Sequence, residues 1–128
     1  ISHFIEHMLF KGTQKRSARQ IAEEMDAVGG NMNAFTDKEC TCFYTRVVDE
    51  HLPLALDMLA DMVLSSRFDP EDIKKEKGVV LEEINMCEDT PDDLVFDLLD
   101  RAHFGTQCVG RPILGTAASV SATRLPSS

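Results

Sequence analysis

ISHFIEHMLF, residues 1–10, places two histidines and a glutamate among apolar side chains. If this stretch is helical, His3 and His7 lie one turn apart on the same face, where both ring nitrogens can reach one metal ion. Glu6 is adjacent to His7, so its carboxylate could take a proton from a metal-bound water. The order H-x-x-E-H is that of an inverted zinc-hydrolase motif.

A structural role is the alternative for these two histidines. The apolar residues around them predict a largely buried helix, and a histidine on such a helix is often a hydrogen-bonded core residue or a half-exposed cap. The pentad at residues 3–7 therefore leaves both interpretations open. A third ligand elsewhere in the chain would distinguish them.

Length and composition describe an ordinary globular chain. The 128 residues are enough for one domain with one core. The contents of 43% hydrophobic and 27% charged residues exclude a disordered class, and no apolar run approaches the length of a membrane span. The formal charge of −9 disfavours a nucleic-acid partner, because phosphate binding needs a basic surface. A cationic or neutral peptide suits this chain better.

The four cysteines show no C-x-x-C pair. Cys40 and Cys42 would point to the same face of a strand, where they cannot easily bridge one another. We expect Cys40, Cys42, Cys87 and Cys108 to be reduced packing residues in a reducing compartment.

Periodicity and turn signals predict an α+β fold. The expected elements are a helix to about Phe10 that stops near Gly12, a helix at 18–28 capped by Ser17, strands at 31–36 and 40–48, a helix capped by Asp49, and helices beginning at Pro70 and Thr90. The residues 105–115 are expected to be a loop, Thr116 to cap a last helical turn, and 125–128 to be irregular. This order predicts a mostly antiparallel sheet with helices packed on one face.

The helix expected at 70–88 offers a candidate third ligand. With residues placed one hundred degrees apart, Glu76 and Glu83 lie along the edge of its apolar stripe, whereas Glu82 points nearly the opposite way. A carboxylate beside a buried stripe needs a cation, hydrogen bonds or a metal. Helix phase therefore favours Glu83 over Glu82 as a ligand. Solvation of Glu76 and Glu83 at the edge of an ordinary amphipathic helix remains the alternative.

Four sequence blocks resemble the pitrilysin or insulinase family of zinc metallopeptidases, and most closely the bacterial relatives of the mitochondrial processing peptidase β subunit. The blocks are HFIEHMLFKGT (3–13), GG (29–30) with NAFT (33–36), EKGVVLEEI (76–84) and GRPILG (110–115).

The resemblance implies a zinc endopeptidase that hydrolyses unfolded peptides or presequences. Family spacing puts the third zinc ligand about 76 positions beyond the second histidine, which selects Glu83 to join His3 and His7. It also implies that Glu6 is the general base and that Glu76 supports the site from outside the ligand set. A further implication is that Asn33, Ala34 and Phe35 bind extended substrate as an added strand.

The resemblance also implies a larger assembly. Family members are longer and contain a second homologous domain or subunit, so we expect residues 1–122 to be a fragment of an N-terminal catalytic domain and 123–128 to be an irregular tail. The expected location is the bacterial cytoplasm, with the mitochondrial matrix as the alternative.

Two other functions compete with catalysis. One is a non-catalytic subunit of the same fold, used for assembly or substrate capture. The other is a structural zinc site, which would need no base such as Glu6 beside it.

Overall fold

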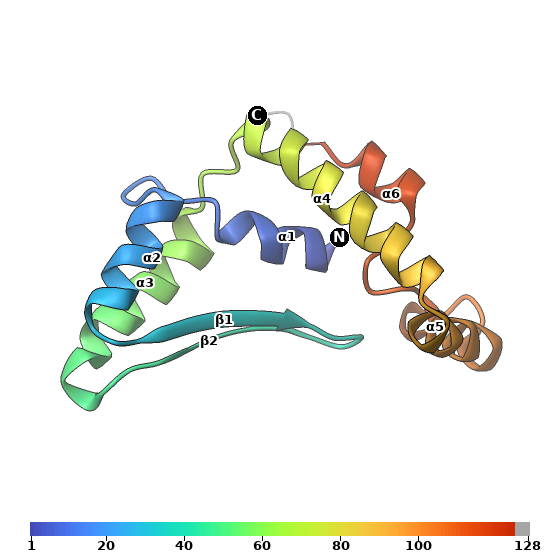
Figure 1. Cartoon of the computed structure of the whole chain (residues 1–128), viewed down its shortest axis with the longest axis horizontal. Coiled ribbons are helices and arrows are strands. Elements are labelled where there is room, and N and C mark those ends of the chain that lie inside the picture. Colours follow the sequence, from blue (N-terminus) through green and yellow to red (C-terminus); the bar gives the residue numbers. More distant parts are fainter. Residues whose placement is uncertain (125–128) are drawn as a thin grey trace.

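A computed structural model describes residues 1–124, so the irregular end expected at 125–128 lies outside the described residues. The elements are α1 (Ser2–Leu9), α2 (Ala18–Ala27), β1 (Asn31–Thr36), β2 (Thr41–Arg46), the short helix η1 (Asp49–His51), α3 (Leu52–Ser65), α4 (Pro70–Asp89), α5 (Pro91–Phe104), the short helix η2 (Cys108–Gly110) and α6 (Ala117–Ala122). The α+β class is confirmed, and α1 lies over one face of an antiparallel hairpin (Figure 1).

The hairpin joins β1 and β2 in a register that runs from Asn31 opposite Arg46 to Thr36 opposite Thr41. The turn is closed by the Asp37 N–H, which donates to the Cys40 carbonyl at 2.7 Å. Cys40 belongs to this turn and the strand ends at Arg46, so the second strand is shorter than the predicted 40–48. Alternate residues of β1 are exposed and half-buried, so one face of the strand is turned toward the helices.

Two clusters of buried side chains form the core on either side of the molecule. Where α1, α4 and α6 meet, the buried residues are Phe4, Met8, Val80, Ile84 and Val120. Between α2 and α3, they are Ile21, Met25, Met58 and Met62. Each such side chain stabilises the fold by about 1.5–3 kcal/mol relative to its exposed state. The first cluster fixes α1 against α4.

Local signals explain most helix ends. Ser17 and Gln20 form a reciprocal capping box at the start of α2, as the prediction of a Ser17 cap requires. Gly29 follows α2 with φ +63°, and its N–H donates to the Asp26 carbonyl at 2.9 Å. Gly12 has φ +117° but lies in a turn beyond the end of α1, not at the helix end itself.

The prediction that Asp49 caps the next helix is wrong. The chain first makes the η1 turn, and α3 begins at Leu52 with His51 at the cap position and no side-chain capping bond. The Asp49 carboxylate instead accepts from the Glu50 N–H at 3.0 Å, inside that turn. Within residues 1–124, none of the helices combines the length and apolar character needed to cross a membrane.

Candidate metal centre

The helix α1 presents His3 and His7 side by side. Phe4 and Met8 are buried against α4 and α6, which turns the two histidines toward the same side of the helix. Their ring centroids lie 4.6 Å apart with an angle of 63° between the planes. The predicted one-turn spacing therefore brings the two imidazoles together.

The helix α4 adds Glu83 to this pair. Glu83 Oε2 lies 3.7 Å from His3 Nε2 and 3.6 Å from His7 Nε2. Ligand atoms about 2.1 Å from a tetrahedral zinc ion lie roughly 3.4 Å from one another, so these separations are close to those of a zinc site. Glu82, the neighbour that helix phase rejects, is exposed.

The state of these donors fits a metal ion. Glu83 Oε2, which faces Nε2 of both histidines, is buried and has no hydrogen-bond partner among the described residues. Burial, together with the neighbouring His7, lowers the pKa of His3 below its ordinary value. The neutral imidazole is the form that binds metal, so the burial of His3 favours its metal-binding form. Two imidazoles and a carboxylate are also an ordinary zinc donor set.

Glu76 contacts the outer nitrogen of His7. Its Oε2 lies 3.0 Å from His7 Nδ1, and its Oε1 lies 2.6 Å from Lys11 Nζ. Burial alone would raise the pKa of Glu76, but the hydrogen bonds from Lys11 and His7 hold that pKa below its usual range. An ionised Glu76 accepts the proton of Nδ1, which leaves Nε2 of His7 free to bind a metal.

Glu6 is held by the hairpin. The Thr36 hydroxyl donates to Glu6 Oε2 at 2.5 Å and also lies 3.2 Å from the Thr41 hydroxyl. Thr36 was not among the predicted site residues. The sequence feature that could have identified Thr36 is the alternation of β1. This alternation places Met32, Ala34 and Thr36 on the half-buried face of the strand.

The predicted substrate strand lies beside the site. A pocket of about 310 Å³ is lined by Glu6, His7, Phe10, Lys11, Asn33 and Glu76. Asn33 therefore reaches the pocket, whereas Ala34 and Phe35 are not among its lining residues. The Asn33 side chain accepts from the Ala34 N–H at 2.8 Å, and Phe35 is 49% exposed. In the described part of the chain, β1 pairs with β2 alone, so its other edge has no strand beside it.

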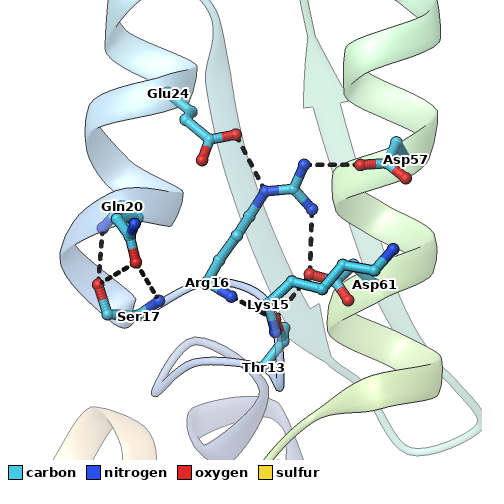
Figure 2. Close-up of polar contacts among 8 residues, drawn as sticks. All are labelled: Thr13, Lys15, Arg16, Ser17, Gln20, Glu24, Asp57 and Asp61. Atoms are coloured by element: carbon cyan, nitrogen blue, oxygen red, sulfur yellow. Dashed lines mark hydrogen bonds and ion pairs between the residues drawn. The ribbon is translucent and has the colours of Figure 1, made fainter.

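A polar cluster anchors the loop that follows α1 (Figure 2). Arg16 reaches Asp61 at 3.0 Å, Asp57 at 2.6 Å and Glu24 at 2.9 Å. The Thr13 hydroxyl donates to Asp61 at 2.6 Å. These bonds tie the end of the motif segment to α2 and α3.

The sequence matches the family described as Insulinase (Peptidase family M16) over residues 1–117. The chain belongs to the insulinase family. The predicted resemblance to this family is thereby confirmed.

Curated proteins resemble this chain in sequence, and solved structures resemble it in fold. The chain is 58% identical over 121 residues to a protein of Bacillus subtilis named as the uncharacterized zinc protease YmxG, covering 94% of this chain and 30% of that protein. A protease from Helicobacter pylori has the same fold, with a TM-score of 0.92 at 20% identity over 97% of this chain and 30% of that one.

A second solved structure is described as a peptidase M16 inactive domain from Pseudomonas fluorescens. It superposes with a TM-score of 0.85 at 19% identity and covers 95% of this chain and 30% of that one. These two structural likenesses establish the insulinase-family fold alone. The chain spans 26–30% of the length of the first curated relatives it matches.

Proposed function

We propose that this chain carries the zinc site of an endopeptidase and that His3, His7 and Glu83 are its metal ligands. The observation that carries the proposal is the convergence of their donor atoms within 4.8 Å of one another, from two helices that the core holds together. When bound, zinc supplies Lewis acidity that polarises a scissile carbonyl and lowers the pKa of a water ligand toward neutrality.

Glu6 is the proposed general base. Its carboxylate lines the same pocket as His7, and its Oε2 is held by the Thr36 hydroxyl. In this position Glu6 takes a proton from the attacking water and passes it to the leaving amine. The hydrogen bond from Thr36 stabilises the ionised carboxylate and fixes its orientation. A purely structural zinc site would not need the Glu6 carboxylate at this position.

Glu76 is proposed to orient His7. It accepts from Nδ1 at 3.0 Å and therefore selects the tautomer whose Nε2 lone pair faces Glu83. Glu76 is not itself a ligand in this proposal, because both of its oxygens already have partners in Lys11 and His7.

The proposed substrate is an extended segment of an unfolded peptide or a presequence. The free edge of β1 can add such a segment as a further strand, and Asn33, Ala34 and Phe35 are the proposed contacts. The charge of −9 favours a cationic or neutral peptide.

A larger protein is proposed to complete the enzyme. Residues 1–122 would form part of an N-terminal catalytic domain, and a second homologous domain or subunit would enclose the substrate. The coverage of about 30% of the Bacillus subtilis relative supports this proposal. A bacterial cytoplasmic location is proposed from the bacterial sources of the relatives and the four free cysteines, with the mitochondrial matrix as the alternative.

A non-catalytic subunit used for assembly or substrate capture is the second candidate function. The similarity in fold to a structure described as an inactive domain supports this second candidate. The presence of Glu6 beside the three donors favours catalysis instead.

The test of the catalytic proposal is Glu6→Gln in the full-length protein that carries this chain. We expect zinc content equal to wild type and loss of cleavage of an unstructured peptide, by roughly a hundredfold or more. Cleavage at the wild-type rate would refute the base assignment. Zinc without cleavage in the wild-type protein would favour the non-catalytic subunit.

A further inference from the structure

Two carboxylates of α4 approach the same imidazole from different sides. Glu76 lies at Nδ1 of His7 and Glu83 lies at its Nε2. Both are chemically able to bind zinc, and both lie on the side of α4 that faces α1. Something must therefore determine which of them becomes the ligand.

The two carboxylates differ in their cationic partners. Lys11 Nζ lies 2.6 Å from Glu76 Oε1, whereas Glu83 Oε2 has no hydrogen-bond partner in the described structure. The Glu76 side chain is only 7% exposed, compared with 35% for Glu83. Glu6, Glu76 and Glu83 are the three carboxylates of the candidate site. Among residues 1–124, Lys11 is the one lysine or arginine that forms an ion pair with any of them.

The backbone holds Lys11 in place at the end of α1. Its N–H donates to the Met8 carbonyl at 3.0 Å, so the residue follows directly from the helix that carries the two histidines. The next residue, Gly12, has φ +117°, and a Cβ there would lie 3.0 Å from the Arg16 carbonyl. This turn is suited to glycine and sends the chain away while the Lys11 side chain reaches back to Glu76.

We propose that Lys11 is a positioning residue that reserves Glu76 for His7 and thereby leaves Glu83 as the metal ligand. The inference rests on the proposed zinc function and assigns a role to a residue outside the ligand set. With Lys11 on Oε1 and His7 on Oε2, both oxygens of Glu76 are engaged. A buried carboxylate that loses its cation is strongly destabilised, so without Lys11 the Glu76 side chain turns away and no longer holds His7 Nδ1.

A second role for Lys11 predicts the opposite effect on zinc. If its ammonium acted only as a positive charge near the metal, it would repel the ion, and its removal would tighten zinc binding. If it positions Glu76, its removal loosens His7 and weakens zinc binding. The sign of the change therefore separates the two roles.

The experiment compares Lys11→Met, Lys11→Arg and the matched control Lys15→Met, in which an exposed lysine of the same loop is changed. The first readout is the tautomer of His7 in the metal-free protein, measured by long-range ¹H–¹⁵N NMR at about pH 8, where an ordinary imidazole is neutral. The second readout is zinc affinity, measured by chelator competition.

We expect wild type and Lys15→Met to show one His7 tautomer, with the proton on Nδ1. Lys11→Met loses this preference and binds zinc about tenfold more weakly, which is the usual scale for an outer contact of a metal site. Lys11→Arg restores both readouts, because the guanidinium can still pair with Glu76. An unchanged tautomer in Lys11→Met, or zinc binding as tight as wild type or tighter, overturns the proposal.

A double-mutant cycle keeps the test independent of any general loss of stability. In a Glu76→Gln background the amide oxygen can accept from His7 without a counter-ion, so Lys11→Met should no longer change zinc affinity. An equal loss in both backgrounds would overturn the proposal. Failure of the wild-type chain to bind zinc would instead refute the proposed function, while the tautomer would still test the link from Lys11 to His7.

Discussion

Asp57 and Asp61 both bind the guanidinium of Arg16 but occupy different surroundings (Figure 2). The Asp61 side chain is 1% exposed and also accepts from the Thr13 hydroxyl, whereas the Asp57 side chain is 51% exposed. The hydrogen bond from Arg16 lowers the pKa of Asp57. Burial makes Asp61 the residue on which the loop after α1 depends.

We predict that Asp61→Ala lowers the free energy of unfolding by about 3 kcal/mol, because it removes the acceptor of the buried Thr13 hydroxyl proton and one of the carboxylates that pair with Arg16. The matched control Asp57→Ala should change it far less, since that carboxylate is solvated. Urea unfolding of both variants measures the difference. Equal destabilisation by the two substitutions would contradict the assignment of Asp61 as the anchor.

Zinc binding should depend on pH through the two histidines. Protonation removes the lone pair that binds metal, and an ordinary histidine has a pKa of about 6.5. Burial and the neighbouring His7 lower the pKa of His3, so its neutral form persists below that value. We predict that zinc is retained at neutral pH and released on acidification below the ordinary histidine pKa of about 6.5. Dialysis followed by metal analysis measures this, and full occupancy at pH 4 would count against histidine ligands.

Some residues of the candidate site could be predicted from local periodicity and others could not. Helix phase separates Glu83 from Glu82, because both lie in one long helix with a clear apolar stripe. Lys11 lies beyond the end of α1 and Thr36 contacts Glu6 across 30 positions. Periodicity predicts neither the contact of Lys11 with Glu76 nor that of Thr36 with Glu6. Each contact depends on how elements far apart in the sequence pack together.

At the scale of elements, capping residues and prolines in the sequence predicted the start of α4 correctly but not the start of α3. Asp69 followed by Pro70 starts α4, and the Asp69 carboxylate accepts from the Glu71 N–H at 2.9 Å. Asp49 carries the same type of side chain but begins a short turn instead. The sequence signal for a cap is local, and it does not say whether a turn precedes the helix.

The Lys38 side chain links the hairpin to α5. Lys38 Nζ lies 3.0 Å from Asp100 Oδ2 and 3.7 Å from Asp97 Oδ1, and it donates to the Arg111 carbonyl at 2.9 Å. Lys38 is in the turn between β1 and β2, so these contacts hold the tip of the proposed substrate strand.

We predict that Lys38→Met raises amide hydrogen exchange in the hairpin and leaves α1 and α4 unchanged. The pairs are partly exposed, so the loss in global stability should stay below about 1 kcal/mol. Glu39→Gln, at an exposed position of the same turn, is the control and should leave exchange at the wild-type rate. Hairpin exchange that is identical in Lys38→Met and wild type would show that the tip is held by other contacts.

At the scale of the whole molecule, α1, which carries His3, Glu6 and His7 of the candidate metal centre, lies between α4 and the hairpin (Figure 1). The core cluster around Met8 and Val80 sets the distance between the histidines and Glu83, and the hairpin brings Glu6 its partner Thr36. The α+β class and the family followed from the sequence. The relative placement of these elements did not, because it depends on contacts between residues far apart in the chain.

The central claim is that His3, His7 and Glu83 form one zinc site, and zinc titration tests it most directly. Wild type should bind one zinc ion per chain. Glu83→Gln should weaken binding by more than the roughly 10–100-fold cost of losing an outer contact, because it removes a direct ligand. Glu82→Gln, the exposed neighbour on α4, should bind zinc like wild type. Zinc affinity that is unchanged in Glu83→Gln, or reduced equally by Glu82→Gln, would contradict the account.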